Sequence, residues 1–361
     1  MKDRLVERFC SMVRIDSESG NEARFIEWTK GQLEAELSAT CTIDEHGNLV
    51  AKVSAKGAAE SAQPIFLAAH ADTVKPGVGI EPIVEDDVIR SNGETILGAD
   101  DKAGLAAIIE AVLTAQRRPP VEIVVTRGEE IGLVGARNLD LSLLDAKRGI
   151  IADSDALNEV IIGGPTHASL DVEIIGRASH AAAPEHGISA IRVATQAMTR
   201  FEEGKLDDET VANVGTIHGG MIRNGVPERV TIEAECRSLD HDKCLRQAEA
   251  MRAAFEGAAS DAGATANVDV RIEYEASRTP DDSSIVRLAQ EAISAAGLDP
   301  KTQVILGGTD ALILSGRGLE TAVLGVGGQA AHSTDERIRI ADLEKATEIL
   351  RHLVEIAASG T

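Results

Sequence analysis

Five short segments of the chain carry carboxylate and imidazole side chains, which are groups that bind metal ions. Most of these segments follow a short apolar run typical of a buried strand, so their polar side chains lie where strands end. The segments are His70-Ala71-Asp72, Asp100-Asp101, Glu129-Glu130, Asp153-Ser154-Asp155 and Ala331-His332. An open α/β sheet places its ligand site at the carboxyl ends of its strands. One such segment means little, but five together predict a metal-dependent hydrolase.

The spacing inside two segments supports this interpretation. His70 and Asp72 lie two residues apart, so an extended backbone directs both side chains to the same side. Asp100 and Asp101 open a predicted helix, where one carboxylate can cap the helix while the other turns toward a cation. Each pair alone also fits a simpler role, as a polar surface turn or as a helix cap.

Glu129, Glu130 and His332 complete the set. Two adjacent glutamates usually form a solvated, charged loop, but in a metal site one can bind the ion while the other acts as general base on the reacting water. His332 follows a glycine-rich stretch at a predicted strand end. Imidazole and carboxylate together are ligands that zinc, cobalt or manganese accept.

Composition excludes several classes of function. The chain has 361 residues, 43% of them hydrophobic and 2% aromatic, which suffices for a core of Ala, Val, Ile and Leu. Its net charge of -23 argues against nucleic acid and anionic membrane as partners. No apolar stretch is long enough to span a bilayer, and the N-terminus lacks the pattern of a secretory signal. The four cysteines lack paired spacing, so we expect free thiols and a cytoplasmic location.

The order of elements predicts the fold class. Helices and strands alternate over residues 1–165 and again over 280–361, which predicts an α/β domain with a doubly wound, mostly parallel sheet. The pattern changes between Gly163-Gly164-Pro165 and Arg278-Thr279-Pro280. Residues 166–279 show the order β-α-β-β-α-β, which predicts an inserted ferredoxin-like module.

The combined motifs resemble those of the M20 metallopeptidases, and among them the peptidase T-like tripeptidases. The resemblance covers essentially the whole chain and rests on five motifs, which are HAD at 70–72, LGADDKAG at 97–104, EEIGL at 129–133, GGTDA at 307–311 and AHSTDE at 331–336. It implies a zinc-dependent catalytic domain over 1–165 and 280–361, with a lid and dimerisation domain over 166–279.

The resemblance also implies individual roles. Two divalent metal ions, zinc or else cobalt or manganese, would be held by His70, Asp100, Glu130, Asp153 and His332. Asp100 would bridge the ions, His70 and Asp153 would hold one, and Glu130 and His332 the other. Asp72 would orient the His70 ring, and Glu129 would be the general base. The peptide bond after Asp100 would be cis.

Residues of the inserted module would contact the substrate. His180 matches a histidine that reaches the partner subunit's site and stabilises the oxyanion, which implies a homodimer through the lid domain. Arg237 matches an arginine that binds a substrate carboxylate, with Asn213 assisting. Without the resemblance, His180 would be a surface residue and Arg237 part of a salt bridge. No role is assigned to His167 and two other histidines, which we expect to be structural.

The predicted activity is an exopeptidase acting on short peptides. Three departures from the family pattern leave substrate length open: the small residues 327–331 before His332, the sequence Ser154-Asp155-Ala156 after Asp153, and the short chain. The alternatives are an amidohydrolase, deacylase or carboxypeptidase of the same superfamily, acting on N-acyl amino acids or related amides. A non-catalytic metal-binding or dimerisation protein would have lost Glu129 or a ligand, and all of them are present.

Overall fold

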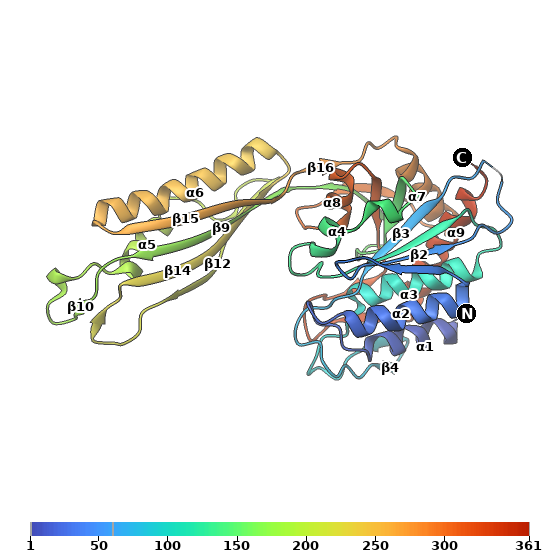
Figure 1. Cartoon of the computed structure of the whole chain (residues 1–361), viewed down its shortest axis with the longest axis horizontal. Helices are drawn as coiled ribbons and strands as arrows, with labels where there is room; N and C mark the ends of the chain where they lie inside the picture. Colours follow the sequence, from blue (N-terminus) through green and yellow to red (C-terminus); the bar gives the residue numbers. More distant parts are fainter. Residues whose placement is uncertain (1, 60, 361) are drawn as a thin grey trace. The chain divides into compact units, whose positions relative to one another are not determined.

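The chain divides into two compact units. The computed structural model describes residues 2–59 and 61–360. The first unit comprises Met1–Gly163, Arg278–Val304 and Gly308–Thr361, and the second comprises Gly164–Ser277 and Ile305–Gly307 (Figure 1). In sequence, the second unit is therefore an insertion in the first.

A large mixed sheet forms the centre of the first unit. Its strands pair in the order β1 (Thr40–Ile43), β2 (Leu49–Val53), β6 (Val121–Thr126), β3 (Ile65–His70), β7 (Arg148–Ile151), β18 (Glu320–Leu324), β8 (Glu159–Gly164) and β16 (Ser277–Arg278), with β17 (Lys301–Val304) beside β8. Strands β6, β3, β7 and β18 run parallel, whereas β2 is antiparallel to β6 and β8 is antiparallel to β18. Strands β3 and β6 are buried along their whole length, as expected where both faces of a sheet are covered. The predicted α/β fold class is confirmed.

Helices cover both faces of this sheet. In Figure 1, α1 (Lys2–Val13), α2 (Ala23–Leu37) and α3 (Ala99–Thr114) lie on one side, with α4 (Val134–Asn138) and α8 (Asp310–Gly316) on the other. Helix α3 packs against α1, strand β3 and α9 (Ile340–Ala357), while α7 (Ser284–Ala295) packs against α9. Helix α3 is predominantly apolar around its circumference and is buried along most of its length, including its charged residues Lys102 and Glu110.

Close packing at the start of α3 requires a residue without a side chain. A Cβ atom at Gly104 would collide with the carbonyl oxygen of Ala152 and the carboxylate of Asp101. Residues Asp100 and Asp101 have non-helical backbone angles, and the peptide bond between them is cis, as the resemblance implied. The start of α3 thus lies directly beside the chain that follows β7.

Very short strands form a second sheet in the first unit. It consists of β19 (Gly328–Gln329), β20 (Arg337–Arg339), β5 (Val88–Arg90) and β4 (Ile83–Glu85), in that order. Segments of two or three residues have no readable periodicity, which is why the sequence did not predict them. Strand β20 connects the turn that carries His332 to α9.

The second unit has the predicted ferredoxin-like topology. Its main strands pair in the order β12 (Thr210–Gly219), β14 (Arg229–Ser238), β9 (Thr166–Ile175) and β15 (Thr265–Tyr274), with β11 (Gly204–Lys205) at the β12 edge. Helices α5 (Ala190–Met198) and α6 (His241–Ala262) pack on one face and enclose an apolar core. A separate pair, β10 (Ser179–His180) and β13 (Gly225–Val226), extends from this layer.

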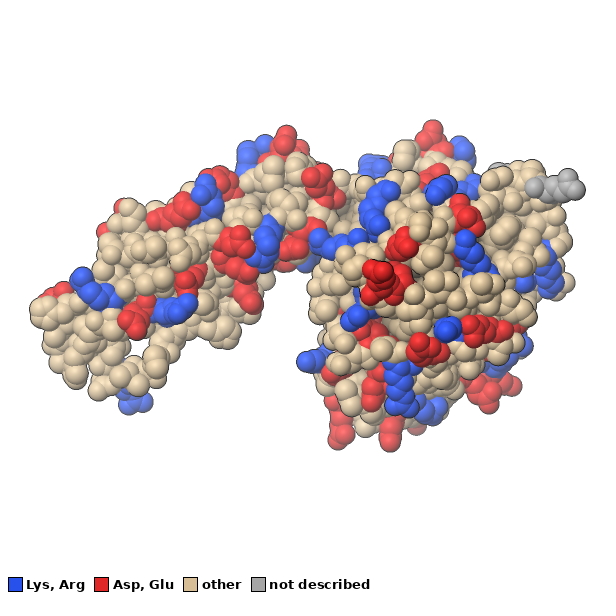
Figure 2. Space-filling model, in the orientation of Figure 1, with Lys and Arg blue, Asp and Glu red and all other residues tan. Residues whose placement is uncertain are grey.

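Charged side chains are scattered over both units. On the face seen in Figure 2, acidic and basic residues are interspersed. Within the described ranges, no helix is both long and apolar enough to cross a membrane. All four cysteines are free thiols, as predicted.

Candidate metal centre

Adjacent parallel strands bring the predicted ligands to one edge of the large sheet. His70 is the last residue of β3, Glu129 and Glu130 follow β6, and Asp153 follows β7. Strand β3 pairs in parallel with both β6 and β7, so the carboxyl ends of all three strands lie together. Asp100 comes from the start of α3, and His332 from the turn between β19 and β20.

Asp100 lies between two imidazole rings. Its Oδ1 atom is 2.9 Å from Nε2 of His70, and its Oδ2 atom is 3.2 Å from Nε2 of His332. The His332 Nε2 atom is also 2.9 Å from Oε1 of Glu130, and His70 Nε2 is 3.9 Å from Oδ1 of Asp153. The five residues predicted as ligands therefore form one cluster, with Asp100 in the middle.

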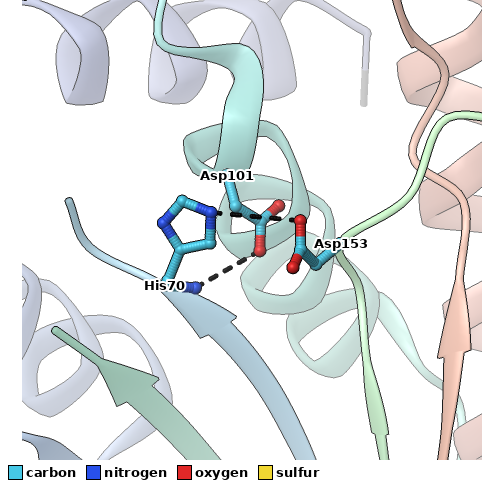
Figure 3. A group of neighbouring side chains, drawn as sticks. All are labelled: His70, Asp101 and Asp153. Atoms are coloured by element: carbon cyan, nitrogen blue, oxygen red, sulfur yellow. Dashed lines mark hydrogen bonds and ion pairs between the residues drawn. The ribbon is translucent and has the colours of Figure 1, made fainter. Parts of the chain in front are cut away.

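Two overlapping groups in this cluster have the spacing of a metal site. In each, one ligand atom per residue lies within 4.8 Å of the others: His70, Asp100 and Glu130 form one group, and His70, Asp101 and Asp153 form the other. Figure 3 shows the second group, with Asp101 and Asp153 both directed toward His70.

Asp101 was not predicted as a ligand. Its Oδ2 atom accepts a hydrogen bond from the His70 amide at 3.3 Å, and its Oδ1 atom accepts one from the Gly104 amide at 3.2 Å. These bonds join the end of β3 to the first turn of α3. Asp101 therefore positions the backbone at this point, and each of its oxygens keeps a second lone pair that could also face a cation.

The donor chemistry of the cluster fits divalent cations. The Nδ1 atom of His70 lies 2.9 Å from the carbonyl oxygen of Asp72, which can only accept, so Nδ1 carries the proton. The other ring nitrogen then faces the carboxylates of Asp100 and Asp153, which are also acceptors. His332 Nε2 likewise faces two carboxylates. Such nitrogens need either a proton or a cation in front of them, and mixed imidazole and carboxylate sets bind zinc and related ions.

The pKa values of the cluster residues are shifted because several carboxyl groups lie close together and are largely buried. Although burial opposes ionisation, hydrogen bonds from His332 and His70 hold the pKa of Asp100 well below its usual value. Hydrogen bonds to Asp100 and Glu130 raise the pKa of His332 to about 10. Burial, reinforced by neighbouring carboxylates, raises the pKa of Asp153 well above its usual value. A bound cation would relieve this repulsion.

Asp72 connects two strand ends. It is fully buried, and its Oδ1 atom accepts a hydrogen bond from the Glu129 amide at 2.9 Å. Its Oδ2 atom accepts from the Glu130 amide at 3.2 Å and from the Ser19 hydroxyl at 2.7 Å. The carboxylate lies 3.5 Å from Nδ1 of His70, farther than the Asp72 carbonyl. Asp72 thus contacts the His70 ring mainly through its backbone, and its carboxylate holds the turn with both glutamates.

Glu129 lines a cavity of about 300 Å³ in the first unit, together with Asp100, Glu130, Asp153 and His332. Burial raises the pKa of the Glu129 carboxyl well above its usual value, and the charges of Asp310 and Glu130 raise it further. A carboxylate that holds a proton more readily than usual, at the wall of the cavity, has the properties of a general base.

The remaining predicted residues belong to the second unit. His180, in β10, is exposed, and its Nδ1 atom accepts a hydrogen bond from the Ala182 amide at 3.0 Å. Arg237, in β14, donates to the Leu306 carbonyl at 3.3 Å and to Oε2 of Glu235 at 3.0 Å. Asn213 is exposed on β12, directly opposite Glu235 in the register.

Sequence reasoning missed three buried or half-buried acids. Glu336 is the last residue of the AHSTDE motif, and Asp310 is the fourth residue of GGTDA. Their position in these two motifs was the only feature of the sequence that could have identified them. Glu235 lies 2.8 Å from Nε2 of His167, for which no role was assigned, and it also binds Arg237. Hydrogen bonds from His167 and Arg237 lower the pKa of Glu235 to about 2, against the effect of burial.

Comparison with known proteins agrees with this geometry. Residues 66–356 match the model of peptidase family M20/M25/M40. A tripeptidase from Staphylococcus aureus subsp. aureus Mu50 is 36% identical, with a TM-score of 0.93 and 99% of each chain covered. Aminopeptidase PepT from Bacillus cereus ATCC 10987 is also 36% identical, with a TM-score of 0.88 and 99% coverage of each.

A curated relative shows the same full-length likeness. The uncharacterised protein YqjE of Bacillus subtilis strain 168 is 38% identical over 368 residues, which is 98% of each chain. The predicted resemblance to M20 enzymes of the peptidase T type is confirmed. The chain belongs to peptidase family M20/M25/M40 and is a metal-dependent peptide hydrolase.

Proposed function

We propose that the chain is an exopeptidase that hydrolyses short peptides, tripeptides first, with two divalent metal ions. His70 and Asp153 would hold one ion and Glu130 and His332 the other, with Asp100 between them. The observation that carries this proposal is the arrangement of Asp100, whose two carboxylate oxygens each face a different imidazole. Zinc is the first candidate for both ions, and cobalt and manganese are the alternatives.

Glu129 would act as the general base. When bound, the ions would lower the pKa of a shared water toward neutrality and polarise the scissile carbonyl. Glu129 would take the proton of the attacking water and pass it to the leaving amine. Its raised pKa favours uptake of the proton from the attacking water.

The second unit would bind the substrate. Arg237 would bind the free carboxylate of the peptide through two parallel hydrogen bonds, with Asn213 assisting. This role is supported by the Nε atom of Arg237, which is buried and has no hydrogen-bond partner among residues 2–59 and 61–360. We also propose that the chain works in the cytoplasm as a homodimer through this unit, in which His180 stabilises the oxyanion of the partner subunit's reaction.

An activity panel tests the proposed substrate class. The chain would be freed of metal, reconstituted with zinc, cobalt or manganese, and assayed on dipeptides, tripeptides and N-acyl amino acids. We expect fastest cleavage of tripeptides with a free N-terminus and a free carboxylate, and no cleavage by the metal-free protein. Faster cleavage of N-acyl amino acids would replace this proposal with a deacylase of the same family.

A further inference from the structure

Glu336 binds the loop that leads to Asp100. Its carboxylate is 1% exposed and accepts three backbone hydrogen bonds. Oε2 accepts from the amides of Leu97 at 2.7 Å and Gly98 at 2.6 Å, and Oε1 accepts from the amide of Asp100 at 3.0 Å. The acceptor and its donors lie more than 230 residues apart in sequence.

The backbone of this loop explains why its amides converge. Gly98 has a left-handed conformation, with φ of 73°, immediately before α3. A left-handed residue at the start of a helix turns successive N–H groups toward one point and creates a concave site for an anion. The Glu336 carboxylate occupies this position, so the anion is a side chain of the protein itself.

The same residue is tied to the turn that carries His332. Glu336 lies four residues after His332, and its amide donates to the Ser333 carbonyl at 3.1 Å within that turn. Strand β20 begins directly after it. One buried side chain therefore connects the loop that presents Asp100 to the turn that presents His332, whose side chains are themselves 3.2 Å apart.

We infer that Glu336 is a positioning residue that sets the separation of Asp100 and His332 and thereby the affinity for metal. It does for these two residues what Asp72 does for Glu129 and Glu130, since each carboxylate holds the amides of a turn that carries site residues. This inference rests on the ligand set of the proposed function. Groups that hold metal ligands in place typically change metal affinity by about 10- to 100-fold when they are replaced.

The test compares two Glu336 variants with a control in the same turn. In Glu336→Gln, the side-chain oxygen can still accept from Leu97 and Gly98, but the amide group would then oppose the Asp100 N–H. Glu336→Asp keeps the charge but is one methylene too short to reach all three amides. Asp335→Asn removes a charge from the neighbouring exposed residue, whose carboxylate makes no hydrogen bond among the described residues.

Metal affinity is measured on metal-free protein by titrating zinc in competition with a chromophoric chelator. The visible absorption of bound cobalt reports ligand geometry. We expect about 10- to 100-fold weaker zinc binding and an altered cobalt spectrum for Glu336→Gln, weaker binding for Glu336→Asp, and no change for Asp335→Asn. If Glu336→Gln does not fold, the zinc affinity and cobalt spectrum of Glu336→Asp test the inference instead.

A folded Glu336 variant with zinc affinity within threefold of wild type and an unchanged cobalt spectrum would overturn the inference, even if the variant melts at a lower temperature. The zinc titration measures metal binding and does not depend on peptide hydrolysis. A chain that binds zinc but does not cleave tripeptides would therefore refute the proposed substrate class and leave this inference standing.

Discussion

Replacing Asp310 by asparagine should stabilise the metal-free protein at neutral pH. Asp310 is the first residue of α8 and is 2% exposed. Its Oδ2 atom accepts a hydrogen bond from the Thr126 hydroxyl at 2.5 Å, whereas Oδ1 has no hydrogen-bond partner within the described part of the chain. Burial raises the pKa of this carboxyl from 3.8 to about 6, although the Thr126 hydrogen bond opposes the change.

The size and sign of the effect follow from this pKa. An acid with a higher pKa in the folded state than in the unfolded state destabilises the fold as pH rises between the two values. A shift from 3.8 to about 6 corresponds to about 3 kcal/mol, at about 1.4 kcal/mol for each pH unit. The asparagine variant carries no charge and keeps an oxygen for Thr126. It should therefore gain about 3 kcal/mol at pH 7.5 and only about 1 kcal/mol at pH 4.5.

Urea unfolding followed by the fluorescence of Trp28 measures this difference. Trp28 is the chain's only tryptophan and lies in α2 of the first unit, so its signal reports the unit that contains Asp310. Thr126→Val is the matched control, because it removes the hydroxyl donor and should cost about 1.5–3 kcal/mol at pH 7.5 and less at pH 4.5. A gain for Asp310→Asn that is equal at both pH values, or a loss at pH 7.5, would refute the reasoning.

Three further predictions concern activity. Glu129→Gln should bind zinc as wild type does but lose about 10²- to 10⁴-fold in kcat, and a variant that keeps its turnover would remove Glu129 from the role of base. Arg237→Lys should raise KM for tripeptides with a free carboxylate but not for the same peptides with an amidated C-terminus, because only the former use the paired hydrogen bonds of the guanidinium. An equal rise in KM for free and amidated peptides would mean that Arg237 stabilises β14 rather than binding the substrate carboxylate. Mixed dimers of His180→Ala and Glu129→Gln subunits should recover part of the wild-type kcat. The site of the His180→Ala subunit would be intact, because it keeps its own Glu129 and receives His180 from the other subunit. Verified mixed dimers without activity would contradict action across the interface.

Local sequence patterns were sufficient to predict the sheet and the strand ends that carry polar residues. Strands β3, β6 and β7 are apolar runs long enough to be recognised; β3 ends in His70, and acids follow β6 and β7. Parallel neighbours bring their carboxyl ends together, so His70, Glu130 and Asp153 had to lie near one another once the strand order was set. The alternation of elements likewise predicted the ferredoxin-like topology of the second unit.

The pairing of individual atoms depended on tertiary structure. The resemblance implied Asp72 as a partner of the His70 ring, which its carboxylate faces at 3.5 Å, but not that this carboxylate also binds the amides after β6. Asp101 was expected at most as a helix cap beside the ligand Asp100, and its oxygens bind the amides of His70 and Gly104. In both cases a carboxylate satisfies buried N–H groups of a distant turn, and periodicity carries no information about such contacts.

Sequence alone thus determined which residue types stand at the ends of which strands, because that information is local and repeats with the period of a strand or helix. Tertiary structure decided that both oxygens of Asp100 face imidazoles, an arrangement that the resemblance but not the sequence pattern implied, and that Glu336 binds the loop before α3. These contacts join segments far apart in the chain, and only the packed sheet and helices place their donors and acceptors within hydrogen-bond distance.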